Sequence, residues 1–519
     1  MGAFYRTILV ICLSLPAVAG ALSQKPGSYL VKFRPNTTES VRQTIHEHAH
    51  AKRVRKYTHP AGLELVQIPA SLTAKALEIY QKDTRVQFVE LNYQMRATQE
   101  LPDTPLFDVQ WGLGPTGINA GPAWSQITGD KSVVIGILDS GVDYNHPDLR
   151  NNIWVNTLEI PNNGVDDDNN GYIDDVHGIN GIEATGDPMD DNGHGTQIAG
   201  IIGAEKNPTM GVSGVVQKVS IIPCKFMNAE GVGDTASALA CMDYFSELAV
   251  RKNSPVKIIA TNNSWSRNRP SMAFKTAVQE HQRLGILFIA SADSRKGNND
   301  TFFVFPANAT ESSSIAVAAS DRTGSLASFS NYGKHSVHVI APGIDIYTTQ
   351  LDGKYGFMSG TSASTAFVTG MVAALKSNNP DLTWIGIKNL IFAGGLPTAS
   401  LDPYIFTSRR VRLIDTNGFG SLSCTNQTVA GRLSPKTANT TIRLGETLLL
   451  SWLSINCANP NPVGLPNIGL HDDGVDGDDA PNDGVYNKLF TPTEAGTYQI
   501  AFGQNDIITV NVVATTASQ

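Results

Sequence analysis

The middle of the chain alternates short, almost continuous apolar runs with longer stretches of helical period. Five apolar runs lie between residues 107 and 415, at 133–138, 219–223, 258–261, 286–290 and 315–318. Runs of this kind suit parallel strands that are buried on both faces. Helices are expected between several of them, for example at 235–251 and 271–284. The alternation predicts an α/β fold with a doubly wound, mostly parallel sheet.

The two flanking regions have a different texture. Residues 27–98 predict a small ferredoxin-like α+β unit, with strands at 29–33, 63–68 and 86–91 and helices at 39–52 and 74–81. After about residue 420, Thr, Asn, Leu and Val alternate and Gly and Pro are frequent. Strands expected there, at 497–501 and 507–513, predict a small all-β, sandwich-like module. The expected domains are therefore 1–20, 21–100, 101–418 and 419–519.

The first 20 residues have the pattern of a secretory signal. Arg6 supplies the positive region, residues 8–15 form a short apolar run, and small residues at 17–21 fit a cleavage site. The apolar run is too short to span a bilayer, and no later run approaches ~20 apolar residues. We therefore expect a secreted or secretory-pathway protein without a membrane span.

The formal net charge of -8 is unevenly distributed. Residues 21–100 carry 12 basic and 7 acidic side chains, whereas residues 101–519 carry 26 and 40. This distribution excludes a uniformly basic nucleic-acid binder. It favours a basic front segment that complements an acidic body.

Cysteine and asparagine patterns also fit the secretory pathway. Cys12 leaves with the signal, and the remaining four cysteines allow three pairings. The pairing that is local in sequence is Cys224–Cys241 with Cys424–Cys457, while Cys224 and Cys241 as buried free thiols are an equal alternative. Glycosylation sequons begin at Asn36, Asn262, Asn299, Asn308, Asn426 and Asn439.

Three reactive side chains stand at the ends of predicted elements, beside or near glycine. Asp139 ends a buried strand, His194 opens an apolar helical stretch, and Ser362 opens a helix that continues toward Leu375. A Ser, a His and an Asp suffice for acyl transfer, because the Ser attacks, the His moves its proton and the Asp orients the imidazole. A Ser at a helix N-terminus also keeps its backbone N–H free for a developing oxyanion.

These motifs, in this order, resemble those of the subtilisin-like serine proteases (subtilases), and the resemblance covers residues 27–415. Residues 107–113 are similar to the usual start of the mature enzyme, and residues 27–98 resemble the family's inhibitory, folding-assisting propeptide. The sequences that carry the resemblance are Asp139-Ser140-Gly141 with His146-Pro147-Asp148-Leu149, Asn192-Gly193-His194-Gly195-Thr196 with Ile198-Ala199-Gly200, and Gly360-Thr361-Ser362.

The resemblance implies a role for each matching residue. Asp139 would orient the histidine, His194 would act as general base and then acid, and Ser362 would be the nucleophile. Two segments would pair with an extended substrate, although ordinary loop structure is the alternative for both and Trp265 has an equal claim as a packing residue. The substrate-binding residues are then Gly231, Gly233, Ser264, Trp265 and Ser266.

Two departures from the family pattern affect the expected activity. Subtilases usually supply an oxyanion donor from an Asn, and the matching position here holds Ser294 or, after a one-residue shift, Asp293. The serine segment has Ala366 where the family has Pro. Two hypotheses remain: a secreted serine endopeptidase made as a zymogen with its own propeptide as inhibitor, and a catalytically impaired, protease-like binding protein.

An acidic loop predicts structural Ca²⁺ rather than a catalytic cofactor, since the triad needs no metal. Residues at 166–175 follow the 1, 3, 5, 7, 9 spacing of a calcium loop, with Gly171 at the sharp turn and His177 in place of the expected Glu. A solvated acidic loop is the alternative. The expected ligands are Asp166, Asp168, Asn170, the Tyr172 carbonyl, and Asp174 or Asp175.

The C-terminal module contains a second acidic run, at 471–486. It is similar to Asp/Gly turns of extracellular β-sandwich modules, and calcium binding or solubility explains it equally well. We expect the module to bind a surface or matrix ligand. Protein or peptide substrates are the other expected partners.

Overall fold

The computed structural model describes residues 24–34, 36–56, 62–93, 109–206, 211–253, 255–267, 270–413, 428–456 and 465–514. The predicted signal at 1–20, Cys424 and Cys457 lie outside the described residues. The chain divides into two compact units, 1–98 and 99–519. Among the described helices, none combines the length and the apolar character that crossing a bilayer requires.

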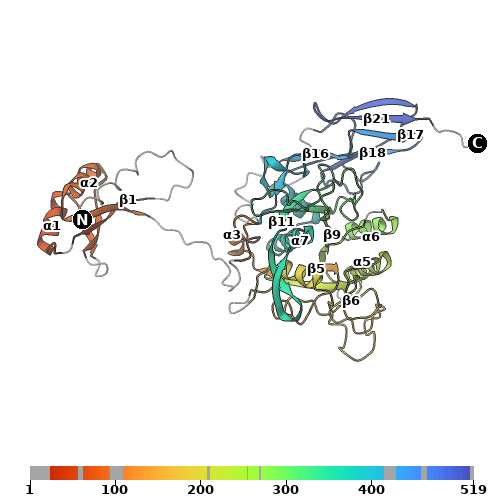
Figure 1. Cartoon of the computed structure of the whole chain (residues 1–519), viewed down its shortest axis with the longest axis horizontal. Coiled ribbons are helices and arrows are strands. Elements are labelled where there is room, and N and C mark those ends of the chain that lie inside the picture. The colour runs from red at the N-terminus through yellow and green to blue at the C-terminus, as the bar shows by residue number, and fades with distance from the viewer. Residues whose placement is uncertain are drawn as a thin grey trace, which may run out of the picture. The chain divides into compact units, whose positions relative to one another are not determined.

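The N-terminal unit has the βαββαβ order of a ferredoxin-like fold (Figure 1). Its antiparallel sheet has the strand order β2-β3-β1-β4. The elements are β1 (Gln24–Phe33), α1 (Glu39–His48), β2 (Lys52–Lys56), β3 (Leu63–Gln67), a 3-10 turn η1 (Ala70–Leu72), α2 (Thr73–Lys82) and β4 (Val86–Tyr93).

The predicted extent of the first helix, 39–52, is wrong at its C-terminal end. The helix stops at His48, His50 has a φ of 50°, and Lys52 begins a strand that pairs with β3. The buried side chain of His46 bonds Glu64 through Nε2 and Tyr80 through Nδ1, both at 2.7 Å. This helix is therefore held to the sheet by a polar contact as well as by apolar packing.

The second unit contains a nine-stranded sheet in the order β14-β15-β11-β10-β9-β8-β5-β7-β6. All neighbours run parallel except β14 and β15. The five predicted apolar runs lie in β5, β7, β8, β9 and β10. The strands are β5 (Gly129–Asp139), β6 (Ile179–Asn180), β7 (Lys218–Lys225), β8 (Ile258–Asn263), β9 (Leu287–Ser291), β10 (Ser314–Ser320), β11 (Val339–Pro342), β14 (Leu396–Pro397) and β15 (Arg409–Arg410).

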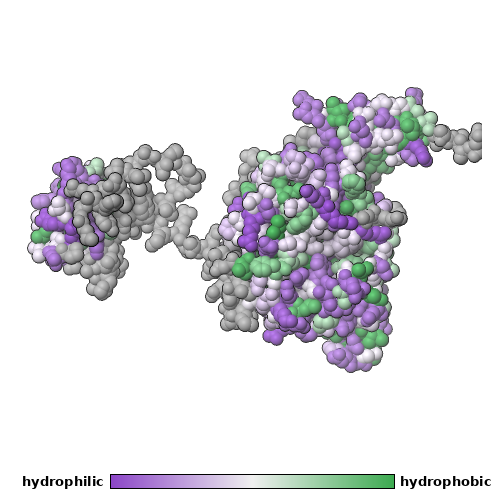
Figure 2. Space-filling model, in the orientation of Figure 1, coloured by the Kyte–Doolittle hydropathy of each residue, from purple (hydrophilic) through white to green (hydrophobic). Residues whose placement is uncertain are grey.

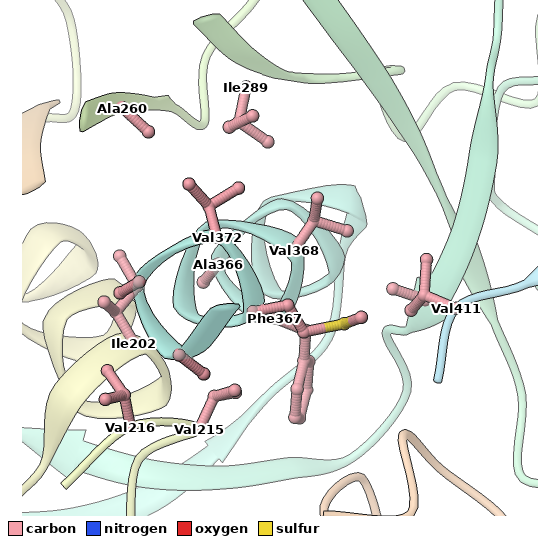
Figure 3. Packing of buried hydrophobic residues seen from close by; sticks show 14 of the residues in the cluster. Ile202, Val215, Val216, Ala260, Ile289, Ala366, Phe367, Val368, Val372 and Val411 are labelled. Atoms are coloured by element: carbon pink, nitrogen blue, oxygen red, sulfur yellow. The ribbon is translucent and has the colours of Figure 1, made fainter. Parts of the chain in front are cut away.

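Helices cover both faces of this sheet, which confirms the doubly wound architecture (Figure 1). One face carries α4 (His194–Gly203), α7 (Thr361–Asn378) and α8 (Trp384–Gly394), and the other carries α5 (Thr235–Val250) and α6 (Met272–Arg283). Figure 3 shows α7 at the centre of the larger core, with Val368 and Val372 among apolar side chains from several elements. Ala366, at the position where the family has Pro, is fully buried in this helix.

Short elements complete the α/β body that contains this sheet. A hairpin of β12 (Ile346–Gln350) and β13 (Lys354–Met358) packs beside α4. The others are α3 (Gly121–Trp124) and the 3-10 turns η3 (Leu351–Gly353) and η4 (Ala399–Leu401). On the face shown in Figure 2, polar and apolar side chains are interspersed over this body.

The C-terminal module is all-β, as predicted, and consists of two three-stranded sheets with a common apolar core. One sheet has the order β16-β18-β19 and the other β17-β21-β20. Val429, Leu453 and Val485 join the larger core of the α/β body, so the module packs on that body. Its strands are β16 (Val429–Ser434), β17 (Asn439–Arg443), β18 (Leu448–Ile455), β19 (Val485–Phe490), β20 (Gly496–Ala501) and β21 (Ile507–Val513).

The disulfide between Cys224 and Cys241 is formed, with Cα atoms 5.7 Å apart. It ties β7 to α5, so the alternative of free thiols is wrong. Among the sequons, Asn262, Asn299 and Asn308 are buried and cannot carry a glycan in the folded protein. Asn36 and Asn439 are exposed, and Asn426 lies outside the described residues.

Candidate active site

Asp139 and His194 meet at the carboxyl end of the central sheet, where α/β proteins bind ligands. Asp139 is the last residue of β5 and is fully buried, and its Oδ1 accepts a hydrogen bond from His194 Nδ1 at 2.7 Å. The His194 side chain is 26% exposed. Burial acts to lower the pKa of His194, but the Asp139 carboxylate, with a smaller contribution from Asp190, raises it, and the net effect holds this pKa above its ordinary value.

The Asp and His loops are held together by Asp190, which the sequence analysis missed. Its Oδ1 accepts from Ser140 Oγ at 2.8 Å and from Gly193 N at 2.9 Å, and its Oδ2 accepts from Thr196 Oγ1 at 2.6 Å. The two loops also approach each other closely, because a Cβ added at Gly195 would lie 1.9 Å from the carbonyl oxygen of Gly141. The only sequence signal was an acidic residue shortly before the histidine motif.

Ser362 lies in the first turn of α7, so its backbone N–H has no acceptor within the helix. Its hydroxyl donates to the carbonyl oxygen of Ser264 at 3.2 Å, and the hydroxyl of Ser264 donates to the carbonyl oxygen of Ser362 at the same distance. Both residues are described, and their hydrogen bonds include none between Ser362 and His194. Ser362 Oγ must therefore rotate away from Ser264 before it can bond His194, which is common for catalytic hydrogen bonds without substrate.

Ser294 and Asp293, the two candidates for the oxyanion donor, have different surroundings. Ser294 Oγ accepts from Thr361 N at 3.1 Å and lies 3.1 Å from Thr361 Oγ1, beside the N-terminus of α7. The Asp293 carboxylate accepts from Ser294 N at 2.7 Å and pairs with Arg295, whose Nε donates at 2.6 Å. Only the Ser294 hydroxyl is in contact with the turn that carries Ser362.

A cleft of about 600 Å³ brings the two predicted substrate segments together with His194. Gly231 and Gly233 line it, as do Ser264, Trp265 and Ser266. Trp265 also packs against Phe226 and Phe274, with ring centroids 5.4 Å apart in each case. Trp265 is therefore both a packing residue and part of the cleft wall.

The acidic loop brings two of the predicted carboxylates, Asp168 and Asp175, together with one that was not predicted. Glu159, Asp168 and Asp175 each offer an oxygen, and these oxygens lie within 4.8 Å of one another. Glu159, seven residues before Asp166, was missed because it lies outside the calcium-loop spacing. Burial raises the pKa of Asp175 to about 6.

The other predicted ligands shape the loop through hydrogen bonds. Asp166 accepts from the N–H groups of Asn170 and Gly171, and Asn170 Oδ1 accepts from Tyr172 N. Asp174 accepts from the N–H groups of residues 163 and 164. Asp166 and Asp174 lie outside the group of three carboxylates, and the predicted ligand set stays a prediction.

Comparison with known proteins assigns the family. The model of the subtilase family matches residues 130–400, so the chain belongs to the subtilase family. A second model, the conditioned medium factor second Ig-like domain, matches residues 453–506 in the C-terminal module.

The chain is similar to several curated proteases. It is 34% identical over 304 residues to subtilisin-like protease 1 of Plasmodium berghei. The matched region covers 55% of this chain and 49% of that protein. It is 32% identical over 292 residues to a thermophilic serine proteinase of a Bacillus species. The matched region covers 56% of this chain and 63% of that protein. The chain thus spans about half the length of the Plasmodium relatives that it matches.

One solved structure that resembles the chain is a cold adapted subtilisin-like serine proteinase. It is 24% identical and covers 57% of this chain and 97% of that chain, with a TM-score of 0.45.

Proposed function

We propose that the chain is a secreted subtilisin-like serine endopeptidase, made as a zymogen, with Asp139, His194 and Ser362 as its catalytic triad. The observation that carries this proposal is the 2.7 Å hydrogen bond between buried Asp139 and His194. His194 and Ser264 both line the cleft, and Ser264 is hydrogen-bonded to Ser362. Labelling with a fluorophosphonate, which reacts with activated serines, tests it.

In this mechanism Ser362 Oγ turns from the Ser264 carbonyl to His194 Nε2 and attacks the peptide carbonyl carbon. His194 takes the hydroxyl proton, and Asp139 holds the imidazole in the right tautomer and stabilises its positive charge. The N–H of Ser362 and the hydroxyl of Ser294 would bind the oxyanion. His194 then protonates the leaving amine, and water hydrolyses the acyl-enzyme by the same steps.

An extended peptide would add as a strand between the two walls of the cleft, paired through backbone hydrogen bonds. Gly231 and Gly233 leave room for a close backbone approach on one side, and Ser264, Trp265 and Ser266 would pair on the other. The apolar surface of Trp265 and Phe274 favours apolar substrate side chains at the adjoining position.

The N-terminal unit would be the inhibitory propeptide, with the signal at 1–20, the propeptide at 21–100, the catalytic domain at 101–418 and the module at 419–519. Two observations support this: its independent ferredoxin-like core, and its basic charge against the acidic body. Cleavage is expected between about residues 96 and 105, outside the described residues.

The second candidate is a protease-like binding protein that acts through the C-terminal module on a surface or matrix ligand. The observations that favour it are the missing oxyanion Asn and the hydroxyl of Ser362 being bonded to Ser264 instead of His194. The same labelling experiment distinguishes the two, since a shell without turnover would not be labelled.

Removing the Ser294 hydroxyl is expected to lower kcat by about 10- to 100-fold with little change in KM. The reason is that a donor to the oxyanion acts mainly in the transition state, and loss of such a donor costs up to about 10²–10³. Steady-state kinetics of Ser294→Ala on a peptide substrate measure the effect. Ser313→Ala, which deletes a buried hydroxyl without a hydrogen-bond partner, is the control and should keep full activity. An unchanged kcat in Ser294→Ala would show that Ser294 is not the donor.

We also propose that Glu159, Asp168 and Asp175 hold a structural Ca²⁺, which would supply charge balance to the loop. Three hard carboxylate oxygens in reach of one ion fit calcium. Free Ca²⁺ at one hundred times Kd should then stabilise the protein by about 2.7 kcal/mol. Thermal unfolding with Ca²⁺ and with chelator measures this.

Glu159→Gln is the informative variant for this site, and Glu183→Gln, an exposed carboxylate nearby, is its control. Glu159→Gln should lose most of the calcium-dependent stabilisation, and Glu183→Gln should keep it. Equal stabilisation of both variants would exclude Glu159 as a ligand.

A further inference from the structure

A second group of carboxylates lies in the C-terminal module, in the loop before β19. Asp472, Asp478 and Asp483 each offer an oxygen, and these oxygens lie within 4.8 Å of one another. Asp478 is 7% exposed and Asp483 is fully buried. Like charges this close in a buried place repel one another unless a cation compensates them.

Hydrogen bonds within the loop account for two of the three carboxylates. Asp472 accepts from the N–H groups of Asp483 at 3.0 Å and Gly484 at 2.9 Å, and Asp478 Oδ2 accepts from Gly474 N at 2.6 Å. The positions of the Asp472 and Asp478 carboxylates are therefore explained by hydrogen bonds that hold the loop. Asp483 Oδ1 accepts from Val485 N at 2.8 Å, which leaves only its Oδ2 to be explained.

One buried oxygen atom of this cluster has no hydrogen-bond partner, and a second lies on a side chain that contacts the cluster through its other end. One is Asp483 Oδ2, and the charged group of Lys388 lies 3.6 Å from it. The other is Asn487 Oδ1, on an amide whose Nδ2 donates to Asp478 Oδ1 at 3.0 Å and so lies against the cluster. Each unmatched buried oxygen costs free energy, so a missing partner is indicated.

The charge of the cluster indicates what kind of partner is missing. The three carboxylates and the Lys388 ammonium leave two negative charges, the neighbouring Asp479 carboxylate adds another, and a divalent cation would offset most of this charge. Carboxylate and amide oxygens held by a loop are the ligands that calcium accepts.

We propose that Asp472, Asp478 and Asp483 bind a calcium ion in the C-terminal module, with Asn487 Oδ1 as a further ligand. The amide of Asn487 would turn over to offer its oxygen. This proposal does not depend on the proposed protease activity.

The same ion would fasten the module to the α/β body. Asp479, next to Asp478, accepts from Ser312 N at 3.0 Å through its carboxylate, and its carbonyl oxygen accepts from Gln282 Nε2 at 3.1 Å. Lys388, on α8, faces Asp483 from the same body. An ion that fixes residues 478 and 483 therefore also fixes the contacts between them, and calcium should stabilise the docking of the module.

Calorimetric titration of CaCl₂ into the chelator-treated full chain tests the proposal. A Ser362→Ala background prevents self-digestion. In this background Asp478→Asn should bind one calcium equivalent fewer than its parent. Asp473→Asn is the matched control, since it makes the same charge change at an exposed carboxylate of the same loop, and its amide oxygen can still accept from Val475 N. This control should bind as many equivalents as the parent.

Equal calcium stoichiometry for the parent and Asp478→Asn would overturn the proposal. If Asp478→Asn does not fold, Asn487→Ala replaces it, because this variant keeps all three carboxylates. It should bind the same equivalent at least tenfold more weakly, and an unchanged affinity would exclude Asn487 as a ligand. Because each result is a difference from the parent, calcium at Glu159, Asp168 and Asp175 does not affect the outcome.

Discussion

Replacing Ser362 by Ala is expected to lower kcat by about 10⁶-fold, the order of loss found when the nucleophile of subtilisin itself is removed. Ser362 starts α7, and its hydroxyl is the one that the attack on the substrate carbonyl requires. The triad acts as a unit, so the remaining members cannot compensate for the missing nucleophile. Turnover of a fluorogenic peptide by the purified, processed protein measures the loss.

Ser359→Ala is the matched control for this prediction. Ser359 is an exposed serine three residues before Ser362, and its hydroxyl accepts from Asp345 N rather than facing the cleft. Its removal should leave kcat within about threefold. If Ser362→Ala and Ser359→Ala retained the same activity, Ser362 would not be the nucleophile and the binding-protein alternative would gain support.

Replacing Asp139 by Asn should lower kcat by about 10⁴-fold, because the amide stabilises the wrong tautomer of the histidine. The variant should also shift the pH dependence. His194 acts as a base only when neutral, so kcat/KM rises as pH passes the pKa of His194. The Asp139 carboxylate holds this pKa above 6.5, whereas burial alone lowers it.

The acidic limb of kcat/KM should therefore have its midpoint above pH 6.5 in the wild type and at lower pH in Asp139→Asn. Rates measured between about pH 5 and 9 give both midpoints. Asp187→Asn, which removes an exposed carboxylate bonded to Tyr144, should leave the midpoint in place. A midpoint that is the same in Asp139→Asn and the wild type would mean that Asp139 does not control the protonation of His194.

Much of the fold could be predicted because strong local patterns agree with the tertiary structure. The apolar runs marked β5, β7, β8, β9 and β10, since strands buried on both faces need apolar side chains at every position. The positions of Asp139, His194 and Ser362 at the ends of elements could also be read from the sequence. Strand β2, with the sequence Lys52-Arg53-Val54-Arg55-Lys56, was not predicted because four of its five residues are charged, although it pairs with β3.

The parts of the site that escaped prediction act through hydrogen bonds that no sequence motif marks. Asp190 accepts from Ser140, which is distant in sequence, and Glu159 accepts from the backbone N–H of Asp167. The choice between Ser294 and Asp293 was a matter of register along the sequence. The ion pair of Asp293 with Arg295 and the contact of Ser294 with Thr361 distinguish their environments.

The most direct measurement of the proposed function is fluorophosphonate labelling of the expressed full-length chain, compared with Ser362→Ala, with the mass of the labelled species determined. If the chain is a zymogen of an active endopeptidase, the wild type is labelled on Ser362, and the labelled species begins between about residues 96 and 105. Ser362→Ala is then neither labelled nor processed. A wild-type chain that folds but remains unlabelled and keeps residues 21–100 would contradict the proposed function.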